Sequence, residues 1–252
     1  MNQNIRVIFF DLGGTFRIIR KDKDYAFAAK KRITELVGTD MEPEAFQKLI
    51  DSRYDVYREW ALKYMCEAPE DVLWTRWLTP EFDREKIKDA ASALTYELRK
   101  VKGERLVVDG GVETVKELDR RGYTLGIISD LVGVNEVDEW LDRDGLRKYF
   151  KTVQQSSITL LRKPHPAIYY YAMHELGALP ENCAYVGDNL NRDIIGAKAS
   201  GLGMTVAVEY PNMPALKLTP ENMPDAKISA FPQLLDIFPA CGKVDSEKII
   251  KP

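Results

Sequence analysis

Five side chains that can take part in catalysis stand at or just beyond the ends of short apolar segments. An aspartate directly follows the apolar run VIFF, and a serine closes the segment YTLGIIS. A lysine lies on a loop behind a third segment, and two aspartates belong to the stretch GDNLNRD. Parallel sheets bind their ligands beyond the carboxyl ends of their strands, so we expect all of these side chains to meet at one sheet edge. They are Asp11, Ser129, Lys163, Asp188 and Asp193.

The three aspartates of this group predict a metal ion. Carboxylates held close together repel one another unless a cation lies among them, and the single charge of Lys163 cannot balance three. Ligand sets made only of oxygen atoms favour a hard cation. The sequence therefore predicts Mg²⁺ as the cofactor.

The hydroxyl of Ser129 and the ammonium of Lys163 indicate phosphoryl transfer. The equatorial oxygens of a transferring phosphoryl group need hydrogen bonds and positive charge, which a hydroxyl, an ammonium and a metal ion supply together. We therefore expect Asp11 to be the nucleophile. Taken singly, these residues have commoner roles: a strand-end serine bonds to backbone, a lysine lies on the surface, and Asp193 caps a helix.

Strand-like and helix-like segments alternate along the carboxyl-terminal half of the chain. This order is typical of right-handed crossovers between parallel strands. Together with the strand before Asp11, it predicts an α/β fold with a Rossmann-like parallel-sheet core formed by residues 1–16 and 105–240. Residues 241–252 lack this pattern, and we expect them to form a C-terminal tail.

Residues 17–104 interrupt the core and predict an inserted α-helical cap domain. The pattern becomes helical directly after Thr15, and Asp24 is the expected N-cap of the first helix. The expected helices cover residues 24–38, 43–64, 69–78 and 84–101. Aromatic side chains crowd this insertion, where they pack the core of the helices or form a wall that faces a substrate. They are Tyr54, Tyr57, Trp60, Tyr64, Trp74 and Trp77.

Basic residues outnumber acidic ones at the start of this insertion. Most of them are expected to form a solvated face. Arg17 and Arg20 follow Thr15 closely in the sequence, and we expect these two side chains to bind an anionic substrate.

Composition and charge narrow the class of protein. The chain has 252 residues, of which 45% are hydrophobic and 30% charged, as in an ordinary globular protein. A net charge of −3 gives no support to a nucleic-acid or anionic-membrane partner. Cys66, Cys183 and Cys241 have neither metal-ligand nor disulfide spacing, which favours a reducing compartment. With no signal-peptide pattern and no run of about 18 apolar residues, we expect a cytoplasmic protein; its oligomeric state stays open.

The stretches that carry these residues resemble the four motifs of the haloacid dehalogenase superfamily, in the branch with a helical cap inserted after the first motif. DLGGT is similar to the family's DxDGT, and Ser129 to its strand-ending Ser or Thr. LRKPHPAIYYYA is similar to the family's Lys followed by Pro, and VGDNLNRDIIGAKASG to its GDxxxxD. The motifs follow one another in the family's order, and the resemblance covers nearly the whole chain. It implies a magnesium-dependent hydrolase that acts on a phosphorylated small molecule.

The resemblance also implies a role for each matching residue. Asp11 attacks phosphorus, while Ser129 and Lys163 bind the phosphoryl oxygens. Magnesium is held by Asp11, by Asp188 and by the backbone carbonyl of residue 13, and Asp193 ligates it through water or steadies Lys163. The remaining expected phosphate-binding residues are Gly14, Thr15 and Asp130.

The chain departs from the family's pattern at Gly13, where the phosphatases carry a second aspartate. That aspartate resembles a general acid that protonates the leaving oxygen and then a base that activates water. Losing such a group typically lowers the rate by about 10² to 10⁴. The effect should be smaller for an acyl phosphate, an anhydride or an aryl phosphate, because each of these leaves as a stabler anion than an alkoxide does.

Gly13 leaves three functions open. The chain is a magnesium-dependent phosphohydrolase or phosphotransferase whose missing acid comes from the cap, the substrate or solvent. Alternatively, it resembles the phosphonoacetaldehyde hydrolases, in which a cap lysine forms a Schiff base, with Lys48 and Lys63 as candidates. The third possibility is a catalytically impaired module that binds a phosphorylated ligand or retains an aspartyl-phosphate. A dehalogenase is disfavoured, because those enzymes work without magnesium and carry a bulky residue where this chain has Gly13.

Overall fold

The structure is a computed structural model that describes residues 4–241. A parallel sheet of six strands forms its centre. The strands are short, and β1 is buried on both faces, as expected for an interior strand of a parallel sheet. In spatial order they are β5 (Phe150–Gln155), β4 (Thr124–Ser129), β1 (Val7–Phe10), β6 (Cys183–Gly187), β7 (Met204–Val208) and β8 (Ala226–Ile228). The α/β fold with a Rossmann-like core is thereby confirmed.

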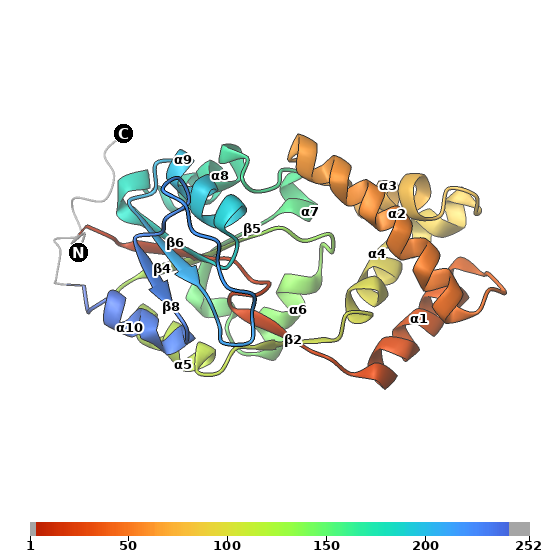
Figure 1. The fold of residues 1–252 in the computed structure, drawn as a ribbon, viewed down its shortest axis with the longest axis horizontal. Coiled ribbons are helices and arrows are strands. Elements are labelled where there is room, and N and C mark those ends of the chain that lie inside the picture. Colours follow the sequence, from red (N-terminus) through yellow and green to blue (C-terminus); the bar gives the residue numbers. More distant parts are fainter. Residues whose placement is uncertain (1–3, 242–252) are drawn as a thin grey trace.

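Helices cover both faces of the sheet (Figure 1). One face packs against α5 (Gly111–Arg120), α6 (Glu136–Arg143) and α10 (Leu234–Ile237), and the other against α8 (Pro166–Leu176) and α9 (Gly196–Ala199). Shorter helical segments are η2 (Arg147–Tyr149), α7 (Ser156–Thr159), η3 (Pro180–Asn182), η4 (Leu190–Ile195) and η5 (Phe231–Gln233).

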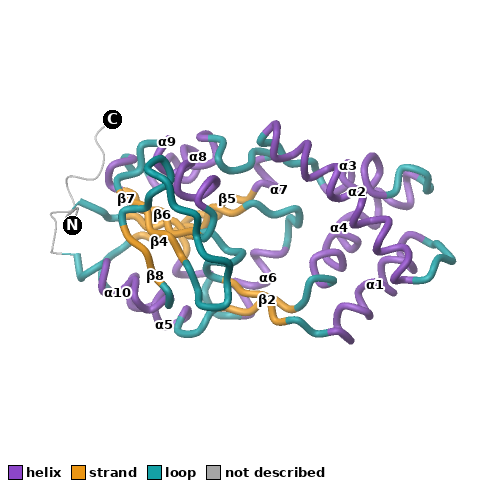
Figure 2. The backbone as a smooth tube through the Cα atoms, viewed as in Figure 1, coloured by secondary structure: helices purple, strands orange, loops and turns teal. Residues whose placement is uncertain are grey.

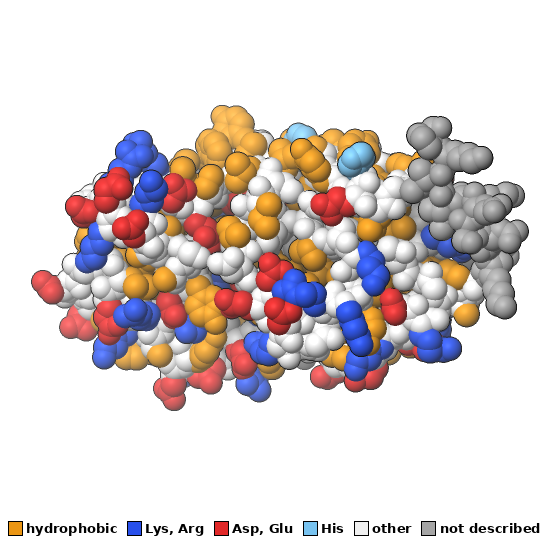
Figure 3. Space-filling model, turned by 180° about the vertical axis from the view of Figure 1, so that it is seen from behind, with side chains coloured by type: hydrophobic (Ala, Val, Ile, Leu, Met, Phe, Trp, Pro, Cys, Tyr) orange, Lys and Arg blue, Asp and Glu red, His pale blue; other side chains and the backbone are white. Residues whose placement is uncertain are grey.

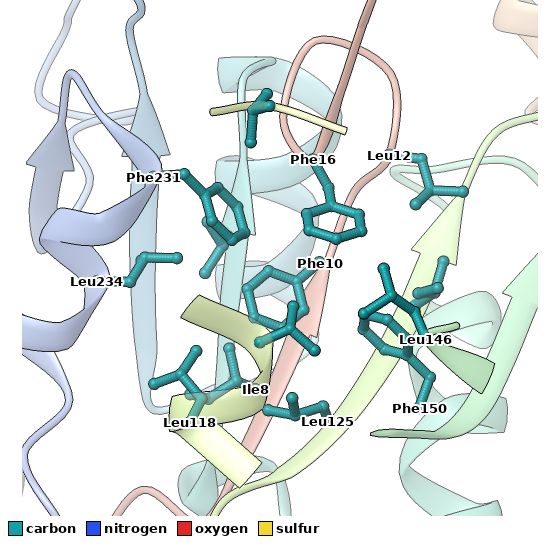
Figure 4. Close-up of a cluster of buried hydrophobic side chains, with 14 of the residues drawn as sticks. Ile8, Phe10, Leu12, Phe16, Leu118, Leu125, Leu146, Phe150, Phe231 and Leu234 are labelled. Carbon is teal, nitrogen blue, oxygen red and sulfur yellow. The ribbon is translucent and has the colours of Figure 1, made fainter. Parts of the chain in front are cut away.

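The side chains of β1 alternate between the two faces, as the pleat of a strand requires. Ile8 and Phe10 belong to the larger hydrophobic cluster, which Figure 4 shows. Val7 and Phe9 belong to the cluster that contains Tyr169 of α8. Burial of both sets fixes the register of β1, and with it the place of Asp11.

A second, helical lobe is inserted between β1 and β4 (Figures 1 and 2). We call α1 to α4, with the segments between them, the helical unit. Its elements are α1 (Lys23–Val37), α2 (Pro43–Tyr64), α3 (Glu70–Val72), the π-helical η1 (Leu73–Leu78) and α4 (Arg84–Lys100). The predicted helices are therefore present. The N-cap of α1 is Asp22, which accepts a hydrogen bond from Tyr25 N at 3.0 Å, and the prediction of Asp24 was wrong by two residues.

The first residues of the insertion are a strand, and the prediction of a helical pattern directly after Thr15 was wrong. β2 (Arg17–Arg20) pairs antiparallel with β3 (Glu104–Val107), so the two connections between the lobes lie side by side. Ile18 and Ile19 are β-branched residues that favour a strand, and β3 supplies the pairing partner for this segment.

The aromatic residues of the helical unit divide between its core and its surface. Tyr57 and Trp74 are buried in its hydrophobic cluster. Trp60 and Tyr64 are exposed, although the ring of Trp60 lies 5.6 Å from both Tyr64 and Trp77, centroid to centroid. The set therefore packs the core and also continues outward onto the surface of α2.

Within residues 4–241, the helices fall short of the length and apolar character that crossing a membrane requires. On the face shown in Figure 3, Lys and Arg side chains are interspersed with Asp and Glu. The predicted tail lies outside the described residues except for Cys241, whose backbone N–H donates to Arg121 O at 2.9 Å.

Candidate active site

Asp11 opens the loop that follows β1, and only 4% of its surface is exposed. Its Oδ1 accepts hydrogen bonds from Ser129 Oγ at 3.0 Å and from Lys163 Nζ at 2.8 Å. The register of the sheet explains the first contact, because Phe10 is paired with Ile127 of β4 and Ser129 lies at the end of that strand. The fold therefore brings Asp11 together with two residues that lie more than a hundred positions further along the chain.

Aromatic packing holds the loop between Asp11 and Thr15 at both of its ends. Phe10 precedes the loop and Phe16 follows it, and both rings point into the core towards Phe231 (Figure 4). The ring centroids of Phe10 and Phe16 lie 5.7 and 5.3 Å from that of Phe231. Side chains locked by packing keep a site within the narrow geometry that chemistry requires.

The ammonium of Lys163 is fully buried and has three oxygen partners. Besides Asp11, its Nζ contacts Asp193 Oδ1 at 2.6 Å and Tyr185 Oη at 2.8 Å. Burial by itself would lower the pKa of Lys163, but the charges of Asp11 and Asp193 outweigh it and raise the pKa to about 12. Lys163 therefore carries a fixed positive charge against the predicted nucleophile.

One carboxylate oxygen from each of Asp11, Asp188 and Asp193 lies within 4.8 Å of the other two. Burial, together with the negative charges of Asp11 and Asp193, raises the pKa of Asp188 to about 7. Burial also raises the pKa of Asp193, although Lys163 opposes this effect. Three carboxylates lie close to the single charge of Lys163, so the cluster carries an excess of negative charge, which the nearby guanidinium of Arg192 partly opposes.

A hard divalent cation fits this donor set. The donors are all oxygen, they converge on one volume, and their uncompensated charge favours a cation over water. Asp193 contributes one oxygen to Lys163 and accepts from Asn189 N at 2.9 Å through the other. Of the two expected roles of Asp193, these contacts favour the steadying of Lys163.

The two glycines after Leu12 have different surroundings. Gly14 has φ +84°, and a Cβ on it would lie 2.4 Å from Asp188 Oδ2, so only glycine fits beside that carboxylate. A Cβ on Gly13 would meet none of the described atoms within 4 Å. The place of the family's second aspartate is therefore open space.

The other expected phosphate-binding residues border the cluster. Thr15 is buried, and its Oγ1 donates to Asp188 Oδ1 at 3.4 Å. The side chain of Asp130 lies behind the site, where its Oδ1 accepts a hydrogen bond from Lys163 N at 2.9 Å. Asp130 therefore supports the backbone at Lys163.

The structure does not place Arg17 as a substrate ligand. Its side chain is buried, donates to Asp144 Oδ2 at 2.6 Å and to Arg105 O at 2.8 Å, and lies 4.3 Å from the ring centroid of Trp140. This expectation was wrong because the strand pairing of β2 turns Arg17 into the core. Arg20 is exposed and pairs with Glu104 on β3, and substrate binding by Arg20 stays a prediction.

Lys48 and Lys63 both lie exposed on α2, with Lys63 Nζ 5.4 Å from the ring centroid of Tyr64. A Schiff-base lysine needs an unprotonated amine, which burial or neighbouring cations promote. Such conditions occur at a different lysine, Lys102 in the connection after α4, whose pKa is lowered by desolvation and by the charges of Arg99 and Arg58. Because Lys48 and Lys63 are exposed, their surroundings offer no argument for a Schiff base.

Sequence reasoning missed two residues of this region. Tyr185 lies in the middle of β6, where its side chain looks like core, yet its hydroxyl accepts from Lys163 and donates to Ile128 O at 2.6 Å. Arg192 lies within the stretch GDNLNRD, and its guanidinium is 3.5 Å from Asp130 Oδ2. A cation inside an acidic stretch was the available signal for Arg192.

The chain belongs to the haloacid dehalogenase-like hydrolases, whose family pattern matches residues 5–201. The fold and the acidic cluster at the end of β1 agree with this membership.

Two curated phosphatases are similar to nearly the whole chain. A glyceraldehyde 3-phosphate phosphatase of Pyrococcus furiosus is 30% identical over 249 residues, which are 97% of this chain and 98% of that protein. A phosphoglycolate phosphatase of Salmonella choleraesuis is 28% identical and covers 97% of this chain and 96% of its own length. By their names, these relatives act on phosphorylated small molecules.

Solved structures support the fold. A 2-haloacid dehalogenase of Pseudomonas syringae superposes with a TM-score of 0.68 at 21% identity and covers 92% of this chain and 97% of its own. A phosphatase of the same superfamily from Thermococcus onnurineus has a TM-score of 0.60 at 20% identity, over 94% of this chain and 99% of its own. Both share the architecture, and at these identities the likeness extends to the fold alone.

Proposed function

We propose that this chain is a Mg²⁺-dependent phosphohydrolase that transfers the phosphoryl group of a small molecule first to Asp11 and then to water. The observation that carries the proposal is the buried contact of Lys163 with both Asp11 and Asp193 inside a cluster of three carboxylates. The names of the curated relatives support a phosphorylated small molecule as the substrate class.

In the first step, a carboxylate oxygen of Asp11 attacks phosphorus, and the bond from phosphorus to the leaving oxygen breaks with its electron pair on that oxygen. Ser129 Oγ and Lys163 Nζ donate hydrogen bonds to Asp11 in the structure. From these positions they can donate to the phosphoryl oxygens of a substrate. In the second step, water attacks phosphorus and loses a proton to solvent, and the bond from phosphorus to the Asp11 oxygen breaks with its electron pair on the carboxylate, which restores Asp11 and releases inorganic phosphate.

When bound, Mg²⁺ would supply positive charge that balances the carboxylates and polarises the phosphoryl group. Asp11, Asp188 and the backbone carbonyl of Gly13 would hold it, with Asp193 fixing Lys163 beside it. Thr15 orients Asp188 through the hydrogen bond at 3.4 Å.

The leaving oxygen receives no proton from residue 13, because glycine has no side chain there and the space is open. We propose that turnover is fastest for substrates whose leaving group is a stable anion, such as an acyl phosphate. Alkyl phosphates then depend on a proton from solvent or from the substrate itself.

Intact-mass measurement tests this function directly. After brief incubation with acetyl phosphate and Mg²⁺, the chain should gain one phosphoryl group, which then decays with release of inorganic phosphate. Asp11→Asn is the control and should stay unmodified. A wild-type chain that binds Mg²⁺ but neither gains the phosphoryl group nor releases phosphate would contradict the proposal.

Gly13 favours a second candidate, a module that binds a phosphorylated ligand with little turnover. In that case the aspartyl-phosphate forms in the same experiment, or phosphate binds, but inorganic phosphate is not released catalytically. The rate of decay of the modified mass separates the two functions.

A further inference from the structure

The segment of the helical unit between α2 and α3 pairs with the loop that leads into Lys163. Arg162 N donates to Met65 O at 2.9 Å, and Glu67 N donates to Leu160 O at 3.0 Å. The two segments therefore form a short antiparallel bridge between the lobes, in addition to the β2–β3 connection.

Glu67, at the end of this bridge, is a buried carboxylate with a complete set of partners. Only 3% of its surface is exposed. Its Oε1 accepts from the Tyr57 hydroxyl, and its Oε2 accepts from Ser156 Oγ at 2.8 Å and from the guanidinium of Arg162. Burial raises the pKa of Glu67, and the charge of Arg162 opposes the increase. Burying a charge is costly unless it is paired, so this arrangement calls for a role beyond packing.

The partners of Glu67 reach both phosphate-binding segments of the core. Arg162 directly precedes Lys163, and its Nη2 lies 3.6 Å from Asp130 Oδ2. The other oxygen of Asp130 accepts from Lys163 N at 2.9 Å. Ser156, whose single hydroxyl proton is donated to Glu67, holds the next residue of that segment, since its Oγ accepts from Leu131 N at 2.9 Å.

We propose that Glu67 is a positioning residue of the active site, through which the helical unit sets the place of Lys163 and of the segment around Asp130 relative to the phosphoryl group. The inference rests on the proposed function, in which Lys163 binds phosphoryl oxygens. It assigns to one side chain of the insertion a role in phosphate affinity that does not require contact with the substrate.

Glu70 provides a matched control. It also lies in the helical unit, is partly buried, and contacts the core, where its Oε1 accepts from Val134 N at 3.2 Å. Burial raises the pKa of Glu70 as it does that of Glu67. Unlike Glu67, it has no hydrogen bond to Arg162 or Ser156 among the contacts of the described residues.

The experiment measures the affinity of inorganic phosphate by calorimetry at saturating Mg²⁺. Glu67→Gln should bind phosphate about tenfold more weakly than wild type, because a displaced Lys163 makes a weaker charge-assisted hydrogen bond to the phosphate oxygens. Mg²⁺ affinity without phosphate should be unchanged, and Glu67→Asp, which keeps the charge, should restore part of the loss. Glu70→Gln should bind phosphate as wild type does.

Phosphate affinity of Glu67→Gln equal to that of wild type would overturn the inference and leave the proposed function standing. Equal losses in Glu67→Gln and Glu70→Gln would overturn it as well, because they would show general loosening of the lobes. A wild-type chain that binds Mg²⁺ but no phosphate would refute the proposed function and the inference together. If Glu67→Gln does not fold, Arg162→Lys tests the same link from the core, and undiminished phosphate affinity there overturns the inference.

Discussion

Lys163 Nζ and Asp11 Oδ1 lie 2.8 Å apart, and the side chains of both residues are almost wholly excluded from solvent. The same ammonium contacts Asp193 at 2.6 Å. A buried cation between two carboxylates cannot be removed without leaving both of them uncompensated. The proposed nucleophile, Asp11, and the cation proposed to bind its substrate, Lys163, therefore also contribute to the stability of the core.

Replacing Lys163 by Met should lower the free energy of unfolding by about 3 kcal/mol in the absence of metal, because it leaves buried charges unpaired. Mg²⁺ should recover part of the loss, since it supplies positive charge to the same carboxylates. Urea unfolding with and without Mg²⁺ measures both effects. Lys227→Met breaks an exposed ion pair with Glu209 and should change the unfolding free energy by less than about 1 kcal/mol. A loss no larger in Lys163→Met than in this control would contradict the prediction.

Gly13→Asp should raise the turnover of alkyl phosphates by about 10²-fold or more, the usual contribution of a positioned acid or base. The first atom of the new side chain has room, because a Cβ at this position meets no described atom within 4 Å. Steady-state release of inorganic phosphate from a sugar phosphate measures the effect. Gly13→Ala, which adds the Cβ without the carboxyl group, should not share the gain. An unchanged rate in folded Gly13→Asp would mean that another group already supplies the proton.

Gly14→Ala should behave very differently from Gly13→Ala. At φ +84° a Cβ costs about 1 to 2 kcal/mol of strain, and here it would also lie 2.4 Å from Asp188 Oδ2. We expect a lower melting temperature and weaker Mg²⁺ binding, because Asp188 must move away. Thermal unfolding with and without Mg²⁺ compares the two alanine variants. Equal melting temperatures and equal Mg²⁺ affinities in the two would show that Asp188 is not confined by Gly14.

The strand ends were predictable from sequence because their signals are local. The run VIFF followed by a carboxylate marks the end of β1, and the alternation of segments after residue 105 predicts the parallel sheet. The convergence of Asp11, Ser129 and Lys163 then follows from topology alone, because the carboxyl ends of parallel strands share one edge.

The misassigned and missed residues depend on contacts that sequence patterns do not encode. Arg17 was expected at the substrate, but Asp144 and Trp140, more than 120 positions away, hold its guanidinium in the core. The sequence carries no signal that singles out Glu67 or Tyr185. Their contacts with Arg162 and Lys163 arise only from the fold.

Magnesium should stabilise the folded chain by mass action. At a concentration one hundred times its dissociation constant, a ligand of the folded state adds about 2.7 kcal/mol. Differential scanning calorimetry should therefore show a higher melting temperature with Mg²⁺, reversed by EDTA. In Asp188→Asn, which removes one charge of the cluster, the shift should shrink. Asp142→Asn, on an exposed ion pair with Arg147, is the control and should keep the full shift. A full shift in Asp188→Asn would exclude Asp188 from the metal site.

The ion pair of Arg17 with Asp144 should make part of the stability depend on pH. Burial by itself would raise the pKa of Asp144, but hydrogen bonds from Arg17 and Arg143 lower it below its ordinary value of 3.8. A carboxyl whose pKa is lower in the folded state stabilises the fold above its unfolded pKa, and this contribution disappears as the pH falls through the folded value. Asp144→Asn should therefore lower the unfolding free energy by about 3 kcal/mol at neutral pH, because Arg17 stays buried without its partner. Urea unfolding of wild type and of Asp144→Asn, from neutral pH into the acid range, should show that the difference between their unfolding free energies narrows below about pH 4. A difference in unfolding free energy that stays constant across that range would mean that Asp144 stabilises the fold around Arg17 through something other than its charge.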